Sequence, residues 1–397
     1  MKSILLVSYN ELHITWGGIH RVNKLLMDGL TKMGYKCLYL INKNGNCFYL
    51  NNKECEENKI DKGGLKNYLI DQKVDVIIDQ EGIFTDSFTT AFRSLNLSNI
   101  KLLTVFHSTP SLYEKLYDYK WLLSQIFGQN GIKTKMSNYV RLLSYPLWRK
   151  VSFRNIAKMY QNIYSSSDCC IMLSSNDIPT LKEYVPKLTA ERCVAIPNAL
   201  TFDVTSDDSI LQSKKNQVLI VARLNDNEKR ISLALKIWKI IEDRGILNWN
   251  LTIVGTGPHE TMLKQLAVKL NLANVSFEGR QQSEPYYEKA AIFMMTSAVE
   301  GWGLTLTESM QRGVVPVVFN SYPALSDIIT NNLDGCIIPD NNIIAYVDRL
   351  QWLMQNREER EQIAKNALIS CQRFVPEKVI EKWIDIIESY NYENTMG

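Results

Sequence analysis

Short apolar segments alternate with amphipathic segments through both halves of this 397-residue chain. In the first half, an amphipathic stretch at 19–33 ends at Gly34, which is typical of a helix that stops at a glycine. The strands expected there are residues 3–7, 36–41, 74–78 and 102–106. The second half repeats the same order between residues 217 and 319. This order predicts parallel sheets covered by helices on both faces, because parallel strands need crossover connections.

The length of the chain indicates two domains, since a single core of this size is unusual. We expect an N-terminal domain at 1–200, a polar linker at 201–216 and a C-terminal domain at 217–375. Residues 376–397 then form a final amphipathic helix after Pro376. Both domains are predicted to be doubly wound and Rossmann-like, a class that binds ligands at the carboxyl ends of its strands.

The composition excludes several classes of protein. No apolar run approaches the roughly 18 residues that span a bilayer, and the apolar start is too short for a secretory signal. Eight cysteines without CxxC spacing indicate reduced thiols of a cytoplasmic protein. Four histidines, no Cys/His cluster and no Asp-x-Asp sequence predict that no metal and no other cofactor is needed.

The most informative stretch, residues 297–319, reads SAVEGWGLTLTESMQRGVVPVVF. Glu300 follows an apolar strand, Gly301-Trp302-Gly303 form a turn, and Glu308 lies on the helix that comes next. Glycines before a helix let backbone N–H groups approach a phosphate, and carboxylates beside it can bind sugar hydroxyls. The structural alternative is a capping box, in which Glu308 reaches back to Thr305 at the helix start.

A second cue is Val221-Ala-Arg-Leu224, followed by Glu228-Lys-Arg230. Arg223 comes directly after a strand, and Lys229 follows near the start of a helix. Two cations there can neutralise a diphosphate leaving group. The alternative is a pair of solvated surface cations.

These two stretches resemble the retaining glycosyltransferases of family 4, which carry EGFGLxxxEAM and VGRL followed by EKG. Glu300 and Glu308 have the family spacing, with Trp302 where Phe is more usual. Arg230 stands where the family has glycine, and the spacing from arginine to lysine is one residue longer. The choice between Lys229 and Arg230 as the diphosphate ligand therefore stays open.

The resemblance implies a GT-B architecture, with two Rossmann-like domains facing across a cleft and a final helix that crosses back to the first domain. It implies a diphosphate held by Arg223, Lys229 and backbone amides at Gly303, Leu304 and Thr305. It implies that Glu308 binds the ribose, that Glu300 holds sugar hydroxyls, and that His107 contacts the sugar from the other domain. His107 follows the strand 102–106, where a lone histidine is otherwise more often structural.

Two glycine turns resemble the family more weakly. Trp16-Gly17-Gly18, before the first helix, would let the backbone approach the donor, and the alternative is a flexible turn. Val254-Gly-Thr-Gly-Pro258 resembles the family's VGxGP turn, and we expect it to shape the nucleotide side of the cleft. The family binds the base near residues 275–280.

Charge is divided unevenly along the chain. Residues 1–200 hold 25 Lys and Arg against 17 Asp and Glu, whereas the rest is acidic. The segment 113–162 interleaves cations with aromatic residues, and Lys150, Arg154 and Lys158 would form one stripe on a helix. This favours an anionic membrane surface as partner and a peripheral location at the inner face of the cell membrane. The alternative is an ordinary solvated helix, and no motif supports nucleic acid.

The sequence therefore predicts a retaining, metal-independent glycosyltransferase. It would move a hexose or N-acetylhexosamine from a nucleotide diphosphate sugar, expected to be UDP-linked, to a glycan or lipid-linked acceptor in surface polysaccharide synthesis. The alternatives are an inverting or phosphorolytic enzyme of the same fold and a non-catalytic nucleotide-sugar-binding or assembly protein. A dehydrogenase would need GxGxxG after the first strand, which WGGIHR does not supply.

Overall fold

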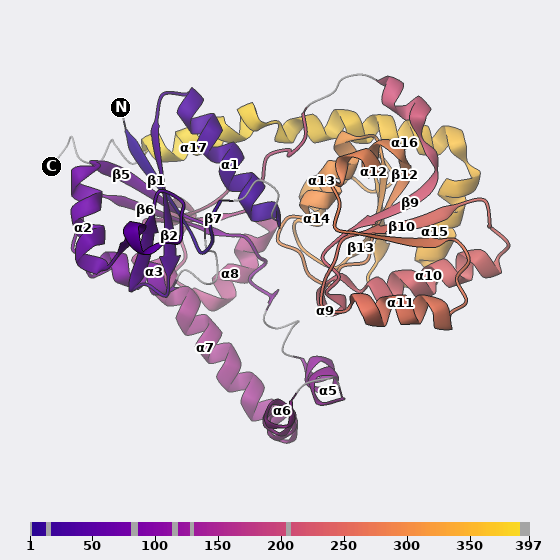
Figure 1. Ribbon diagram of the computed structural model, residues 1–397, viewed down its shortest axis with the longest axis horizontal. Coiled ribbons are helices and arrows are strands. Elements are labelled where there is room, and N and C mark those ends of the chain that lie inside the picture. Colours follow the sequence, from indigo (N-terminus) through magenta and orange to yellow (C-terminus); the bar gives the residue numbers. More distant parts are fainter. Residues whose placement is uncertain are drawn as a thin grey trace. The chain divides into compact units, whose positions relative to one another are not determined.

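The computed structural model describes residues 2–12, 17–80, 86–112, 118–127, 131–203 and 208–389. The chain divides into two compact units, which are described separately below. Unit 1 comprises Met1–Ala199 and Pro376–Gly397, and unit 2 comprises Leu200–Val375. Each unit is a sheet covered by helices (Figure 1).

The sheet of unit 1 has the strand order β4-β3-β2-β1-β5-β6-β7-β8. Its strands are β1 (Ser3–Ser8), β2 (Lys36–Lys43), β3 (Cys47–Leu50), β4 (Lys59–Ile60), β5 (Val74–Asp79), β6 (Lys101–Phe106), β7 (Cys169–Met172) and β8 (Cys193–Ala195). All neighbours from β2 through β1 to β8 are parallel, as the βαβ rhythm predicts.

An antiparallel edge, β2-β3-β4, was not expected. It forms because Asn44 and Gly45 adopt positive φ values of 59° and 68° and reverse the chain after β2. Such φ values at consecutive residues suit the twist of a hairpin.

Helices of unit 1 cover its sheet and also extend beyond it. They are α1 (Gly17–Lys32), α2 (Lys62–Asp71), α3 (Asp86–Arg93), α5 (Tyr119–Phe127), α6 (Ile132–Leu143), α7 (Tyr145–Ser166), α8 (Ile178–Tyr184) and α17 (Pro376–Ser389). The final helix α17 packs along α1, where Gly29 lies against the side chain of Ile380 (Figure 1). Its end is fixed by Glu388, which accepts hydrogen bonds from Lys2 Nζ at 2.9 Å and Tyr35 Oη at 2.7 Å.

Unit 2 contains a parallel sheet of order β11-β10-β9-β12-β13-β14. Its strands are β9 (Lys215–Val221), β10 (Asn250–Val254), β11 (Val275–Gly279), β12 (Ala290–Met295), β13 (Val315–Asn320) and β14 (Cys336–Pro339). Its helices are α9 (Asp226–Lys229), α10 (Ile231–Asp243), α11 (Glu260–Lys269), α12 (Glu284–Lys289), α13 (Leu304–Gln311), α14 (Leu325–Ile328), α15 (Ile343–Gln355) and α16 (Arg357–Ser370).

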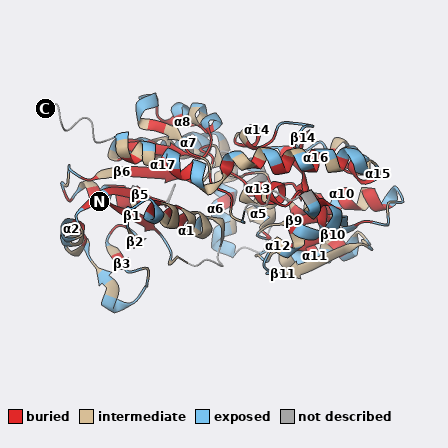
Figure 2. Cartoon of the chain, turned by 90° about the horizontal axis from the view of Figure 1, so that it is seen from above, coloured by how far each residue is buried: buried red, intermediate tan, exposed pale blue. Residues whose placement is uncertain are grey.

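The core of unit 2 lies where amphipathic helices cover fully buried strands (Figure 2). Helix α10 shows the rule, since Ile231, Leu235, Trp238 and Ile241 recur on one face and all are buried. Burial of each such side chain contributes about 1.5–3 kcal/mol to the free energy of unfolding. The central strand β12 is buried along its whole length.

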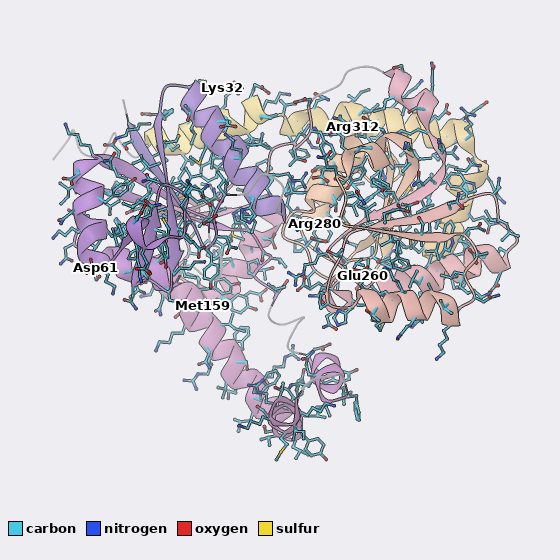
Figure 3. The ribbon with its side chains drawn as sticks, viewed as in Figure 1. Lys32, Asp61, Met159, Glu260, Arg280 and Arg312 are labelled. Carbon is cyan, nitrogen blue, oxygen red and sulfur yellow. The ribbon has the colours of Figure 1, made fainter. Side chains whose placement is uncertain are left out.

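The polar segment 201–216, expected as a linker, differs in the structure. Its described residues belong to unit 2, where a 3-10 turn, Asp208–Ser213, precedes β9. Arg312 (labelled in Figure 3) donates a hydrogen bond of 3.0 Å to the carbonyl of Asp203. The absence of periodicity was misleading here, because the described residues of this segment are part of unit 2 and Leu211 is buried in its core.

Candidate functional site

Unit 2 has one reversal of strand order, between β9 and β12. The chain leaves β9 for β10 and β11 on one side, then returns to place β12, β13 and β14 on the other side. Open parallel sheets bind ligands at the carboxyl ends of the strands beside such a reversal. Arg223 and Lys229 follow β9, and Glu300 follows β12, so three of the predicted site residues lie at this point.

Lys229 and Glu300 form an ion pair at the centre of this region. Lys229 Nζ donates to Glu300 Oε1 at 2.6 Å, and their side chains are only 19% and 13% exposed. The two loops are joined by backbone as well, because Ala298 N–H donates to the carbonyl of Glu228 at 2.7 Å. Lys229 is therefore not a solvated surface cation, and its ammonium lies beside the carboxylate predicted to hold the sugar.

Arg230 has a structural position that settles which of the two cations faces Glu300. Its φ and ψ are 49° and 42°, the left-handed conformation that favours glycine. Its side chain points away from the Lys229–Glu300 pair into a separate set of hydrogen bonds. The guanidinium donates to the carbonyls of Thr296 and Ser297 and to the side chains of Asp340 and Asn341.

Replacing Arg230 tests this interpretation. Arg230→Gly and Arg230→Ala both lose the guanidinium bonds, and each is expected to lower the free energy of unfolding by about 1–3 kcal/mol. The glycine variant should be more stable than the alanine variant by about 1 kcal/mol, because only alanine keeps the left-handed strain. Urea unfolding of both variants measures the difference, and an alanine variant of equal or greater stability would contradict it.

Arg223 differs from Lys229 in its exposure. Its side chain is 66% exposed, and its Nη2 lies 4.0 Å from Glu228 Oε1. An exposed guanidinium at the end of β9 can change its conformation and so reach an anion bound beside the partly buried Lys229.

Helix α13 begins immediately after the glycine turn. Its N-cap residue, Gly303, has a φ of 90°, and a Cβ there would lie 2.9 Å from Tyr322 Oη. The first intrahelical bond is donated by Leu306 to the Gly303 carbonyl. The N–H groups of Leu304 and Thr305 therefore precede the hydrogen-bonded helix, which is the arrangement that binds phosphate oxygens.

Tyr322 lies under this turn and was not predicted from the sequence. Burial raises the pKa of Tyr322 well above its ordinary value, and the negative charge of Glu300 raises it further. The phenol therefore stays protonated beside the turn, with its Oη placed where a side chain at position 303 would be. No spacing or composition signal in the sequence indicated Tyr322.

Glu308 is fully buried on the inner face of α13. Its Oε1 accepts a hydrogen bond of 2.9 Å from Thr201 Oγ1. The capping-box alternative is wrong, because α13 begins at Leu304 with Gly303 as the N-cap, so Thr305 is already inside the helix. Thr201 is the second residue that the sequence analysis missed, since it falls in the segment assigned as a linker.

The glycine turn after β10 has a packing role. A Cβ on Gly255 would lie 1.9 Å from the carbonyl oxygen of Ala222, and one on Gly257 would lie 2.7 Å from the backbone of Leu224. These glycines let the loops after β10 and β9 touch backbone to backbone, with Leu224 N–H donating to the Thr256 carbonyl at 2.9 Å. The turn thus positions the loop that carries Arg223.

In unit 1, the carboxyl edge of the sheet gathers a separate group. His107 follows β6, Gln80 follows the neighbouring β5, and Gly17 and Gly18 open α1, whereas Trp16 lies outside the described residues. His107 Nε2 and Gln80 Oε1 are 2.6 Å apart. Because an amide oxygen only accepts, Nε2 carries the proton and Nδ1 is left as an acceptor. Both side chains line a small, largely apolar pocket.

Burial lowers the pKa of His107 to about 4. The neutral ring suits a hydrogen-bonding role toward a hydroxyl group. Gln80 was missed by the sequence analysis, although a polar Asp-Gln-Glu run directly after a strand could have indicated it.

The depressed pKa of His107 predicts how stability depends on pH. The unfolded chain binds a proton near pH 6.5, whereas the folded chain does so only near pH 4, so stability falls as pH decreases through this interval. Between pH 7 and pH 5 the loss assigned to His107 is about 2 kcal/mol. Urea unfolding should show a smaller loss in His107→Gln, and equal losses in both proteins would contradict the assignment.

Among the described residues, no group of three or more His, Cys, Asp or Glu side chains is placed to hold a metal ion. Nor does any helix in the described part of the chain have the length and apolar character needed to cross a membrane.

Comparison with known proteins gives a consistent result. Residues 202–370 match the family model described as glycosyl transferases group 1, and this range contains Arg223, Lys229, Glu300 and Glu308. An uncharacterized glycosyltransferase of Haemophilus influenzae is 30% identical over 196 residues, which cover 49% of this chain and 54% of that protein. The chain therefore spans about half the length of this relative.

A second relative matches over a longer part of the chain. It is the GalNAc-alpha-(1->4)-GalNAc-alpha-(1->3)-diNAcBac-PP-undecaprenol alpha-1,4-N-acetyl-D-galactosaminyltransferase of Campylobacter jejuni. The two proteins are 24% identical over 267 residues, which cover 67% of each chain. Among solved structures, Anabaena HepE in complex with UDP and glucose superposes with a TM-score of 0.69 at 14% identity, over 98% of this chain and 100% of that one. The predicted fold class is confirmed, since the α/β architecture with two Rossmann-like units is that of the GT-B glycosyltransferases.

Proposed function

We propose that this chain is a glycosyltransferase that moves a sugar from a nucleotide diphosphate sugar to a hydroxyl of a glycan or lipid-linked acceptor. The observation that carries the proposal is the Lys229–Glu300 pair at the strand-order reversal of unit 2, near the first N–H groups of α13. A cation, a carboxylate and a helix N-terminus at one point suit a ligand that joins a diphosphate to a sugar.

The comparisons support the classes of donor and acceptor. The solved structure of HepE contains UDP and glucose, and the Campylobacter relative is named for transfer to an undecaprenol-linked acceptor. By analogy, the donor proposed here is a UDP-linked hexose or N-acetylhexosamine, and the product belongs to surface polysaccharide synthesis. The location that fits such an acceptor is the cytoplasmic face of the membrane, with segment 113–162 on its anionic surface.

In this proposal the diphosphate lies against Lys229, Arg223 and the backbone amides of Gly303, Leu304 and Thr305. As the bond between the anomeric carbon and the phosphate oxygen breaks, negative charge grows on the departing diphosphate. Cations and fixed N–H dipoles stabilise that charge, and a partly buried ammonium does so more strongly than an exposed one.

The sugar and the ribose would be held by carboxylates. Glu300 binds sugar hydroxyls and stabilises the positive charge that develops on the ring. Glu308, which accepts a hydrogen bond from Thr201, binds the ribose. The resemblance to family 4 assigns His107 of unit 1 to the sugar, and its Nδ1 would accept a hydrogen bond from a hydroxyl group. It also assigns Gly17 and Gly18, at the start of α1, to the donor.

The chemistry proposed is retaining and independent of divalent metal, as in family 4. The acceptor oxygen attacks the anomeric carbon on the face that the nucleotide leaves, and the leaving phosphate oxygen takes the acceptor's proton. This step needs no general base from the protein, because the departing diphosphate supplies one. The lysine and arginine would carry the electrostatic role that a divalent cation has elsewhere.

Nucleotide release from a panel of UDP-, GDP- and ADP-sugars, with EDTA present, tests the proposal. Selective release from one donor, reduced in Glu300→Ala and Arg223→Ala, is the expected result, and addition of a lipid-linked acceptor should accelerate it. Donor binding without any release in the presence of acceptors would favour a non-catalytic nucleotide-sugar-binding protein. Release that depends on a divalent cation would overturn the metal-independent mechanism.

A further inference from the structure

Helix α6 carries its apolar side chains on the face that points toward solvent. Ile132, Met136, Val140 and Leu143 recur at helical spacing, and each is more than half exposed, as is Tyr139 beside them. The opposite face is polar and packed, because Asn138 is buried and its neighbours Lys135 and Arg141 are partly buried. A surface helix of a globular protein normally has the reverse arrangement.

The start of α7 also exposes apolar side chains. Leu147 and Val151 are exposed, and they share one helix face with Lys150, Arg154 and Lys158, which are exposed as well. The later part of α7 packs against α3 and α8, and Tyr160, Ile163 and Tyr164 are buried there. Near the start of the helix, Tyr145 contacts Tyr119 of α5.

The picture of unit 1 agrees with this division of α7. Its N-terminal half extends away from the sheet, with α6 and α5 at its far end (Figure 1). Met159, labelled in Figure 3, lies on the part of α7 nearer the sheet. Side chains also line the part of the helix that extends from there toward α6.

Charge selects the kind of partner for this surface. Between residues 119 and 167 the sequence contains eight Lys and Arg and no Asp or Glu. A second copy of the chain would bring two such cationic surfaces together, which is unfavourable. Nucleic acid would satisfy the cations but leave the aliphatic side chains of α6 in water. An anionic bilayer satisfies both, since its headgroups attract cations and its acyl chains accept apolar side chains.

We propose that α6 and the first half of α7 form a membrane-insertion surface. The apolar residues enter the bilayer interface, and the cations of α7 bind anionic headgroups above it. We call the inserted set the α6–α7 wedge, which consists of Ile132, Met136, Tyr139, Val140, Leu143, Leu147 and Val151. This deepens the membrane partner of the proposed function, and it does not depend on the donor site of unit 2.

Vesicle flotation of the full-length protein tests the wedge. The probes are vesicles of phosphatidylcholine alone and vesicles in which about one third of the lipid is phosphatidylglycerol. The wild-type chain should float with the anionic vesicles and keep part of that binding in high salt, because inserted apolar side chains are not screened. Met136→Ser/Val140→Ser/Leu143→Ser should reduce partitioning at least tenfold and abolish the salt-resistant part.

A second variant separates insertion from attraction. Lys150→Glu/Arg154→Glu/Lys158→Glu should reduce partitioning to the anionic vesicles at least tenfold, so that the protein no longer prefers them to neutral vesicles. A matched control, Leu247→Ser/Val268→Ser/Ile369→Ser, removes three exposed apolar side chains from unit 2. It should float like the wild-type protein.

Each remaining outcome bears directly on the wedge. Wild-type flotation with neither vesicle, or equal flotation of the wild-type and wedge-variant proteins, would overturn the proposal. So would a wild-type dimer in sedimentation that the wedge variant dissociates, because a second copy would then cover this surface. Retained nucleotide release in the wedge variant shows that its fold and donor site are intact, and it separates failure of the wedge from failure of the transferase assignment.

Discussion

Replacing Glu300 by glutamine is expected to slow sugar transfer by about 100-fold while nucleotide binding stays equal or becomes tighter. Glutamine keeps the size of the side chain but removes the negative charge that stabilises the positive charge developing on the reacting sugar. The same carboxylate now binds Lys229 at 2.6 Å and so competes with a diphosphate for that ammonium. Loss of turnover with preserved nucleotide affinity would therefore follow from the geometry of this one pair.

Steady-state kinetics with saturating donor, together with calorimetric titration of the nucleotide, measures both effects. The control is Asp340→Asn, which neutralises the partner of Arg230 in the neighbouring ion pair of unit 2. Transfer by the control should stay within a few-fold of the wild type. If Glu300→Gln transfers sugar at the wild-type rate, the carboxylate has no part in the reaction.

Replacing Lys229 by methionine is expected to reduce both binding and turnover. The ammonium is only 19% exposed and is paired with Glu300, so its loss should weaken nucleotide binding by about tenfold or more. Turnover should fall by a further factor of about 10²–10³, since the departing diphosphate loses a partly desolvated positive charge. The variant also leaves the Glu300 carboxylate without this ion pair, which adds repulsion toward the diphosphate.

A matched lysine distinguishes this effect from a general loss of charge. Lys239 pairs with Asp243 on the exposed side of α10, and Lys239→Met should leave binding and turnover unchanged. Unfolding curves for both variants show whether the chain stays folded. Equal activity of Lys229→Met and Lys239→Met would exclude Lys229 from the donor site.

The sheets could be predicted from sequence because their strands are buried. Parallel strands covered on both faces read as continuous apolar runs, and β1, β12 and β13 are of this kind. The strands β3 and β4 were missed, since they are short and partly exposed. The buried strand β7 was missed as well, and it has only four residues. The Asn44-Gly45 dipeptide between β2 and β3 was the available signal for that hairpin.

The choice between Lys229 and Arg230 could not be made from sequence spacing. It depends on one backbone conformation, because the left-handed φ of Arg230 turns its side chain toward Asp340 and leaves Lys229 facing Glu300. A family position occupied by glycine indicated that such a conformation was allowed there. It could not indicate which hydrogen bonds would hold an arginine in it.

Contacts distant in sequence account for the other omissions. Thr201 holds Glu308 across 107 positions, and Gln80 lies against His107 across 27. The polar run after a strand could have marked Gln80 as a site residue, but no sequence pattern reports which distant side chain either residue contacts. The orientation of α6 is a similar case, because periodicity marks an apolar face but cannot tell whether the protein or a different partner covers it.

Calorimetric titration with UDP, GDP and ADP in the presence of EDTA tests the central claim most directly. The claim is that the loop after β9, the loop after β12 and the start of α13 bind a nucleoside diphosphate without a metal ion. We predict one site per chain for one of the three nucleotides, weakened at least tenfold in Lys229→Met and retained in Arg230→Gly. Absence of binding by all three nucleotides, or equal binding by Lys229→Met, would contradict it.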